Sequence, residues 1–247
     1  MAFSHFPIIE LDSIDSTNNY AMQLIDANKA QQGLTIVAQS QSAGKGQRGK
    51  LWIDAPGESL LMSVIVLPES EISGQFVFNA SVVVAITAIV RNYCPDCDIR
   101  IKWPNDIIIN AKKAGGILIE NVLRGSRWTH AVIGLGLNIK QHSFPENLPF
   151  ATSLKRATGN DIDITKLRDD IIENVMSSII APRPEERIMA QYNEHLYKRG
   201  QKQAFSDGSS KWEATILNAH KDGTLEVQLS DGSIMFYQHG QVLWDWE

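Results

Sequence analysis

The sequence predicts an α+β fold, with a mixed, mainly antiparallel sheet and flanking helices, followed by a small all-β domain. Between residues 99 and 134, short β-rich segments follow one another through tight turns, and strands joined in this way pair antiparallel. Near the C-terminus, short alternating segments are separated by Asp222-Gly223 and Asp231-Gly232, a strong hairpin signal. We therefore predict two domains, residues 1–198 and residues 199–247.

Apolar spacing and breaker residues predict the individual elements. Ser16 is placed to cap a helix whose apolar residues recur at helical spacing. Pro68 stops a β-rich segment, and Pro182 and Pro184 separate two helical segments. We expect helices at 18–28, 76–92, 165–180 and 185–196, strands at 35–38, 60–67, 99–102, 107–109, 116–122 and 129–134, and strands of the small domain at 212–217, 224–229 and 233–237.

The bulk composition is that of an ordinary globular protein. The 247 residues are 43% hydrophobic and carry a net charge of -5, which suits one sizeable core and a small appendage. The acidic balance argues against a general nucleic-acid binder, so we expect no DNA partner. The N-terminus lacks the features of a signal peptide, and the most apolar run, residues 82–90, is far short of a membrane helix. We expect a cytoplasmic protein that does not associate with membranes.

The two cysteines, Cys94 and Cys97, form a Cys-x-x-Cys pair. This spacing also occurs in redox dithiols and in zinc sites, but no second pair and no metal-spaced histidines accompany it in the sequence. We expect a reduced pair in the turn before the strand at 99–102.

The segment from Ile101 to Glu120 holds charges in a β-rich setting. Two apolar runs enclose Lys102 and Asp106, and a polar reversal at 110–113 precedes Gly115-Gly116, where extended structure restarts. Charges at strand ends next to glycines indicate ligand binding. The alternative is a solvated hairpin tip.

A second charged loop, residues 44–50, fits the pattern G-x-G-x-x-G of dinucleotide-binding turns. The context argues against that interpretation, because such a turn carries few charges and opens a helix, whereas this loop contains Lys45, Arg48 and Lys50 and runs into Trp52. Glycines among several cations suit an anion, since backbone N–H groups converge on it and the side chains offset its charge. The alternative is a mobile surface loop.

Five motifs occur in the order seen in biotin protein ligases, and the resemblance spans nearly the whole chain. They are Asp15-Ser-Thr-Asn-Asn-Tyr20, Gln41 with the loop 44–52, Lys102-Trp-Pro-Asn-Asp106, Lys113-Ala-Gly-Gly116 and Gly134-Leu-Gly-Leu-Asn138. The resemblance implies the biotin/lipoate ligase fold, which is similar to class II aminoacyl-tRNA synthetases, with an SH3-like β-barrel at the C-terminus. It also implies that biotin reacts with ATP, in the presence of Mg²⁺, to give biotinyl-5′-adenylate. The biotin then passes to a lysine of a biotin carboxyl carrier protein.

The resemblance also implies residue roles. Lys113 should bridge the biotin carboxyl group and the α-phosphate, Asp106 is the second catalytic residue, and no metal ligands are assigned. The implied biotin-binding residues are Ser16, Thr17, Asn18, Gln41, Gly44, Lys45, Gly46, Gln47, Lys113 and Gly115. The implied ATP- and adenylate-binding residues are Lys45, Arg48, Lys50, Trp52, Lys102, Asn105, Lys113 and Asn138.

The glycine loop departs from the arginine-rich loop that is common in this family. Lys45 and Gln47 stand at usual arginine positions, so closure on a ligand should rest more on Arg48 and Lys50. Because the first motif lies at Ser16, we expect a monofunctional ligase without an N-terminal DNA-binding domain. The alternatives are a lipoate or octanoate ligase of the same fold and a non-catalytic biotin-binding module. The sequence leaves the oligomeric state open, with a homodimer as one alternative.

Overall fold

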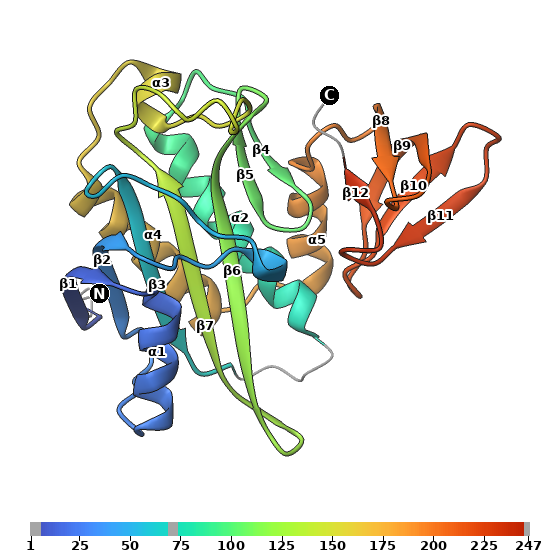
Figure 1. Cartoon of the computed structure of the whole chain (residues 1–247). Coiled ribbons are helices and arrows are strands. Elements are labelled where there is room, and N and C mark those ends of the chain that lie inside the picture. Colours follow the sequence, from blue (N-terminus) through green and yellow to red (C-terminus); the bar gives the residue numbers. More distant parts are fainter. Residues whose placement is uncertain (1–5, 69–73, 245–247) are drawn as a thin grey trace.

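The computed structural model describes residues 6–68 and 74–244, in which the strands form two sheets (Figure 1). The larger sheet has seven strands in the order β1-β2-β3-β7-β6-β5-β4. β1 pairs with β2 in parallel, and the other neighbouring pairs are antiparallel, as predicted. The strands are β1 (Ile8–Ile14), β2 (Thr35–Gln41), β3 (Ser59–Val66), β4 (Ile99–Lys102), β5 (Asp106–Ile109), β6 (Lys112–Arg124) and β7 (Arg127–Asn138).

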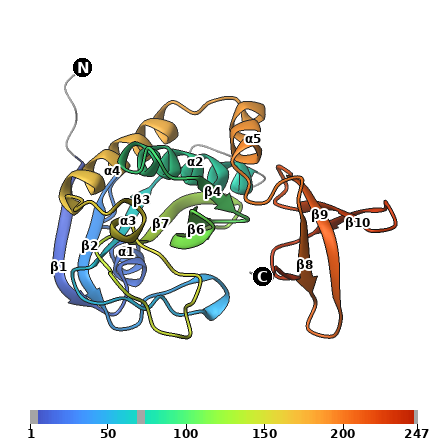
Figure 2. The same ribbon diagram turned by 90° about the horizontal axis from the view of Figure 1, so that it is seen from above.

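Helices cover both faces of this sheet. α2 and α4 lie along one face and α1 lies on the other (Figure 2). Because side chains alternate along a strand, Val64 of β3 belongs to the core beneath α2, whereas Ile65 belongs to the cluster under α1. The helices are α1 (Thr17–Asp26), α2 (Gln75–Tyr93), α3 (Leu154–Thr158), α4 (Ile164–Ile180) and α5 (Glu185–Glu194), so the four predicted helices are confirmed.

The apolar segment of α2 is longer than the run at 82–90 that the sequence analysis considered. Among the described residues it is the helix that is long and apolar enough to cross a membrane, by length and composition. Half of its apolar stretch is buried inside the structure, where the helix packs on α4, α5 and β4. This packing accounts for its composition.

The turn after α2 holds the two cysteines as predicted. Both thiols are free, and Cys94 is buried. Burial and the neighbouring Cys97 raise the pKa of the Cys94 thiol to about 12, so this thiol is protonated at neutral pH. Among the described residues, no group of three or more His, Cys, Asp or Glu side chains is arranged to hold a metal ion.

Two local predictions were wrong. The β5–β6 reversal is a two-residue turn at Asn110 and Ala111, which both have positive φ, so Lys113 lies inside β6 and not in the turn. Ser16 begins α1, but its side chain makes no capping hydrogen bond. The sequence did not predict five elements, namely β1, the 3-10 helix η1 (Gln47–Gly49), α3, β8 and β12.

The smaller sheet is antiparallel, with the order β11-β10-β9-β8-β12. Its strands are β8 (Lys202–Ser206), β9 (Lys211–Ala219), β10 (Leu225–Leu229), β11 (Ile234–Tyr237) and β12 (Leu243–Trp244). The two Asp-Gly hairpins are confirmed, with positive φ at both glycines. The edge strands β11 and β12 do not pair with each other among the described residues, and this small sheet is compatible with the predicted SH3-like domain.

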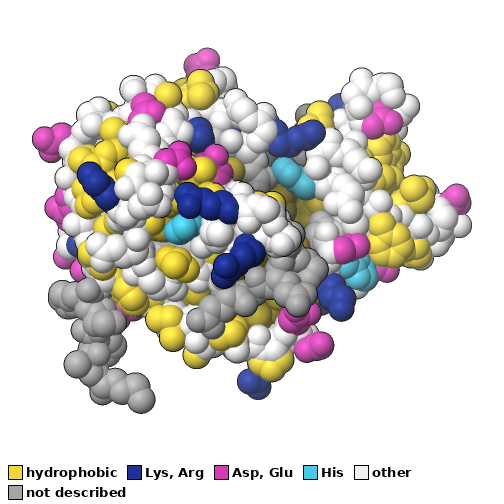
Figure 3. Space-filling view, turned by 90° about the horizontal axis from the view of Figure 1, so that it is seen from below, with side chains coloured by type: hydrophobic (Ala, Val, Ile, Leu, Met, Phe, Trp, Pro, Cys, Tyr) yellow, Lys and Arg dark blue, Asp and Glu magenta, His cyan; other side chains and the backbone are white. Residues whose placement is uncertain are grey.

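The two sheets share one apolar core. Buried residues of the smaller sheet, such as Phe205 and Val227, belong to the same cluster as the core of the larger sheet. The indole N–H of Trp103 donates to the carbonyl of Gly223 at 3.1 Å. The surface of the smaller sheet away from this core also carries hydrophobic side chains (Figure 3). Met235 and Phe236 of β11 are exposed. The domain boundary at 198/199 stays a prediction.

Tyr192 of α5 ties a helix to the turn between β4 and β5. The side chain is fully buried, and its hydroxyl donates to the carbonyl of Pro104 at 2.8 Å. Burial raises the pKa of the phenol well above its usual value, so the group stays a neutral donor.

We expect Tyr192→Phe to lower the free energy of unfolding by about 1–2 kcal/mol, because the partly buried Pro104 carbonyl loses its donor. Urea denaturation followed by circular dichroism measures this change. Tyr20→Phe, at a partly buried tyrosine of α1, is the matched control and should change stability little. Equal effects of the two substitutions would contradict a structural role for the Tyr192 hydroxyl.

Candidate functional site

A cleft of about 910 Å³ lies where the larger sheet, the glycine loop and the end of the smaller sheet meet. Its floor is the α1-side face of β6 and β7. On β7 the cleft is lined by Gly134, Leu135, Gly136 and Asn138, while the buried Leu135 and Leu137 belong to the core cluster. The alternation in Gly134-Leu-Gly-Leu-Asn138 therefore leaves room above the sheet on one face and fills the core on the other.

The charge of the cleft is opposite to that of the whole chain. Its lining contains the cations Lys45, Arg48, Lys50, Lys102 and Lys113. Asp106 is the carboxylate among the described lining residues. Because the chain as a whole carries a net charge of -5, the cations are concentrated here, and the cleft favours an anionic ligand.

Lys113 and Asp106 form an ion pair with 2.7 Å between Nζ and Oδ1. A β-bulge places the lysine: Ile107 pairs with Gly115 and Ile108 pairs with Lys113, so Ala114 is an extra residue. The backbone of Lys113 is also clamped from the side, because its N–H donates to Phe150 and its carbonyl accepts from Thr152. Lys112 is exposed and lies outside the cleft lining.

Polar side chains at the start of α1 form a connected network at one end of the cleft. Gln41 Oε1 accepts from the backbone N–H of Thr17 at 2.8 Å. Ser63 Oγ lies 2.7 Å from Thr17 Oγ1 and 2.6 Å from Asn18 Oδ1. Ser16, Thr17 and Asn18 are all buried, and all three line the cleft.

Trp52 lies against β7 at the other end. A Cβ atom added to Gly136 would come within 2.6 Å of the indole ring, so the absence of a side chain there makes room for Trp52. The indole N–H is buried and has no acceptor among the described residues. Asn138 is fixed, since its amide donates to the carbonyl of Thr152 at 3.0 Å.

Lys102 and Asn105 frame the turn between β4 and β5. The Lys102 ammonium lies 4.7 Å from the centre of the Trp244 ring and 3.5 Å from the Trp244 carbonyl oxygen. The Asn105 amide donates to the carbonyl of Ile117, which anchors the turn on β6. Both side chains line the cleft while making these protein contacts.

The glycine loop reaches the smaller sheet through Arg48. This residue has positive φ, and its guanidinium packs against Gly240, where a Cβ atom would overlap it. The neighbouring His239 contacts Trp103 edge-on, with 5.5 Å between ring centres. Burial, then the charge of Arg48, lowers the pKa of His239, so the ring is neutral at pH 7 and adds no positive charge.

Most of the predicted site residues meet in the cleft, but two do not line it. Gly44 packs behind Trp52 and Gln41, and Gly115 packs against the backbone of Gly136, so both make room for neighbouring groups and face no ligand space. The structure adds lining residues that no motif indicated. They are Ile53, Ile117 and Leu118 next to the motifs, Phe144, Asn147, Leu148, Pro149, Phe150 and Ala151 from the segment after β7, and His239, Gly240, Val242, Leu243 and Trp244 near the end of the smaller sheet.

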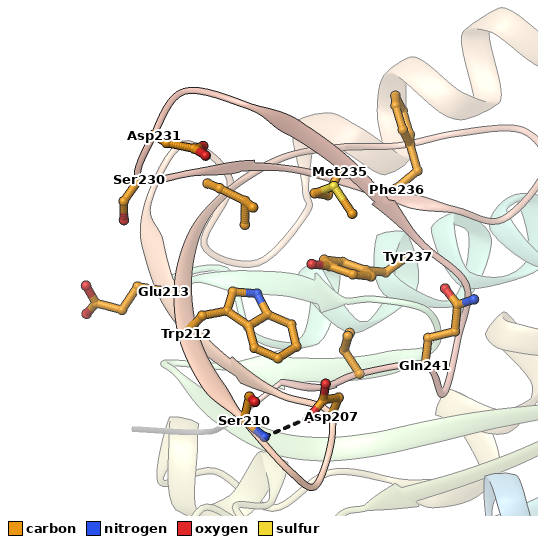
Figure 4. Close-up of a pocket in the computed structure, with 12 residues that line it drawn as sticks. Asp207, Ser210, Trp212, Glu213, Ser230, Asp231, Met235, Phe236, Tyr237 and Gln241 are labelled. Carbon is orange, nitrogen blue, oxygen red and sulfur yellow. Dashed lines mark hydrogen bonds between the residues drawn. The ribbon is translucent and has the colours of Figure 1, made fainter.

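A second hollow of about 880 Å³ lies on the smaller sheet, where Trp212 and Tyr237 project into it (Figure 4). Its carboxylates include Asp207 and Asp231, which accept hydrogen bonds from serines in their own turns. These carboxylates stabilise turns, and no set of side chains resembling a catalytic site accompanies them in the lining.

The fold and the sequence of this chain are similar to those of known biotin protein ligases. The structure of the biotin protein ligase from Aquifex aeolicus in complex with biotin and ATP aligns with a TM-score of 0.78 at 21% identity, covering 97% of this chain and 98% of that one. The profile of the Biotin/lipoate A/B protein ligase family matches residues 10–138. The chain belongs to this family.

Curated relatives agree over the same region. The bifunctional ligase/repressor BirA of Bacillus spizizenii is 35% identical over 174 residues, 68% of this chain and 51% of that protein. The biotin--[acetyl-CoA-carboxylase] ligase of Paracoccus denitrificans is 29% identical over 126 residues, 51% of each chain. The matched regions thus span about half the length of each of these relatives.

Asp54 follows the Trp52 wall of the cleft and has an unusual environment. Its Oδ2 atom is buried without a hydrogen-bond partner among the described residues. Burial raises the pKa of this carboxyl to about 6. Above that pH the folded protein holds a poorly solvated carboxylate, whereas below the ordinary value of 3.8 both the folded and unfolded states are protonated.

Asp54→Asn should therefore stabilise the protein at pH 7.5, by about 1–2 kcal/mol once solvent screening of a half-buried group is allowed for. The gain should shrink as the pH falls from 6 towards 4, since the folded wild-type protein then takes up its proton first. Urea denaturation at both ends of this range tests the sign. Asp96→Asn, at an exposed aspartate, is the control; a pH-independent effect of Asp54→Asn would argue against a desolvated carboxylate.

Proposed function

We propose that this protein is an ATP-dependent biotin protein ligase. Biotin and ATP form biotinyl-5′-adenylate and pyrophosphate, and a lysine of a biotin carboxyl carrier protein or domain then displaces AMP. Family membership supports a ligase of this type, and the relatives named for biotin ligation support biotin over lipoate. The structurally similar ligase from Aquifex aeolicus binds biotin and ATP, which supports the same pair of substrates for this protein.

The observation that carries the proposal is the set of five cations around one cleft. The first half-reaction brings a carboxylate to the α-phosphate of ATP, so two anions must approach each other. Fixed ammonium and guanidinium groups lower the repulsion, and they cost no reorganisation because the protein has already placed them. A cleft of about 910 Å³ holds biotin and a nucleotide together.

Lys113 is the cation best placed to act on the reacting atoms. The bulge in β6 and the clamp from residues 150–152 hold its backbone, and Asp106 directs its ammonium into the cleft. The ammonium binds the carboxylate of biotin and an oxygen of the α-phosphate, and stabilises charge that develops in the transition state. Asp106 then accepts a proton from the attacking carrier lysine, whose amine must be neutral to react.

The remaining roles follow the predicted assignment. Thr17 and Gln41 bind the ureido ring of biotin, which needs short polar groups in a confined slot. Trp52 stacks on adenine over the bare Gly136. The loop cations Arg48 and Lys50 bind phosphate, and Asn138 lies at the adenine edge.

Magnesium enters with ATP in this proposal. Asp106 is the carboxylate in the described lining and is paired with Lys113, which suits a Mg²⁺ ion held mainly by phosphates and water. A bound ion would offset phosphate charge. The cytoplasmic location, the absence of a DNA partner, the monofunctional character and a homodimer stay predictions.

The reversibility of adenylation gives the most direct test of the substrates. We expect labelled pyrophosphate to enter ATP when biotin is present, because the cleft holds both anions in reacting geometry. Lipoate and octanoate should not support exchange. Exchange that is as fast with lipoate would assign the protein to the other branch of the family, and biotin binding without exchange would favour a non-catalytic module.

We expect Lys113→Ala to reduce adenylate formation at least about a hundredfold, the scale for removing a preorganised charge from a phosphoryl-transfer site. Lys112→Ala is the matched control, because the neighbouring side chain is exposed outside the cleft and should change the rate little. Single-turnover formation of biotinyl-adenylate measures both. Comparable losses in the two variants would mean that the charge of the hairpin as a whole, and not Lys113, matters.

A further inference from the structure

The cleft meets the smaller sheet at His239, which lies in the turn between β11 and β12. This turn has a fixed backbone: Gly240 has positive φ, and the N–H of Gln241 donates to the carbonyl of Gln238 at 3.0 Å. In return, the backbone N–H of Gln238 donates to the side-chain oxygen of Gln241 at 2.7 Å. His239 therefore projects from a turn that is held at both ends, and its side chain lines the cleft.

Trp103, in the turn after β4, holds the imidazole ring from the side of the larger sheet. The two rings meet edge-on, with 5.5 Å between their centres and 81° between their planes. Trp103 is itself buried, and its indole N–H donates to the carbonyl of Gly223. Among the residues that the structure describes, no hydrogen bond is formed by either ring nitrogen of His239. Packing thus places the ring, and its nitrogens can still bind a ligand.

The charges around His239 come from three segments. Arg48 and Lys50 belong to the glycine loop, Lys102 ends β4, and Asp106 begins β5. Burial lowers the pKa of the ring most, the charge of Arg48 comes next, and Asp106 acts in the opposite direction. The neutral state at pH 7 does not require one position of the glycine loop, because burial and the charge of Lys102 act from the two sheets on a pKa whose ordinary value is 6.5.

A polyphosphate that enters the cleft reverses this balance. The triphosphate of ATP carries several negative charges, and a negative charge near an imidazole favours its protonated form. The protonated ring donates a charge-assisted hydrogen bond, which is stronger than a neutral one. Lysine and arginine carry their charge at all times and repel one another before the anion arrives, whereas a histidine becomes charged only in its presence.

We propose that His239 binds the phosphate chain of ATP and takes up a proton as the nucleotide enters. The inference rests on the proposed function in taking ATP as the anion. In the complex the ring holds its proton more tightly than in the free protein, so nucleotide affinity is highest at low pH. Affinity then falls as the pH rises through the pKa of the ring in the complex. Biotin affinity stays unchanged, because the groups proposed for the ureido ring, Thr17 and Gln41, belong to another part of the cleft.

Calorimetry of nucleotide binding tests the proton uptake directly. The ligand is α,β-methylene-ATP with Mg²⁺ and saturating biotin, because its bridging carbon prevents adenylation. Titrations at pH 7 in Tris and in HEPES, which differ in heat of ionisation, give the number of protons taken up. We expect the wild-type protein to take up about half a proton more than His239→Gln. His220→Gln is the matched control and should keep the wild-type uptake, because His220 pairs with Glu226 at 2.9 Å outside the cleft lining.

The pH dependence of affinity gives a second readout. Relative to wild type, His239→Gln should bind the analogue about tenfold more weakly at pH 6.5 and at most about twofold more weakly at pH 8.5, as for loss of a charge-assisted hydrogen bond. His239→Lys carries a permanent charge, so it should bind more tightly than His239→Gln by a factor that does not change with pH.

Equal proton uptake by wild type and His239→Gln, a ratio of their affinities that is independent of pH, or no binding of the analogue to wild type would overturn the proposal. The proposed function is tested separately by pyrophosphate exchange. If exchange with biotin fails while the analogue binds with the expected proton uptake, the proposed function is wrong and the role of His239 stands.

Discussion

The register of β6 between β5 and β7 is the constraint on which the site depends. β6 is hydrogen-bonded on both sides, and a shift of one residue would turn every side chain to the opposite face. The extra residue Ala114 makes this shift once, at one point, so that Lys113 faces the cleft while the rest of the strand keeps its core face. Lys113 thus has a fixed backbone, held by β5 and by residues 150–152, beneath a flexible side chain.

The bare face of β7 completes this arrangement. Glycines at 134 and 136 let Asn18 and the Trp52 ring approach the sheet directly, and neither position has room for a Cβ atom. The leucines between them stay in the core. The cleft is therefore built by leaving side chains out of a regular strand, and its depth is set by the sheet itself and not by a loop.

The sequence predicted the elements whose pattern is local. The long apolar helix α2, the Asp-Gly hairpins and the β-rich runs around Asp106 all carry their signal within a few residues. β1 was missed because Glu10 and Asp12 interrupt its apolar residues along the exposed edge of the sheet, and α3 because it is barely one turn long. The positions of the site residues were indicated by motifs, but their contacts were not. Ser63 is visible in the sequence as a hydroxyl within an apolar strand, whereas nothing local links His239 to Trp103 or Gly240 to Arg48.

The contact of Lys102 with Trp244 joins residues 142 positions apart, and both line the cleft. A chain that has folded only its larger sheet therefore lacks one wall of the cleft. A ligand binds with full affinity only to the state in which both sheets are folded. By mass action, a bound ligand therefore stabilises that whole state against partial unfolding. The substrates would then make the unfolding of the two sheets more cooperative. The stability of the smaller sheet, which contributes few polar side chains to the cleft, therefore increases with substrate concentration.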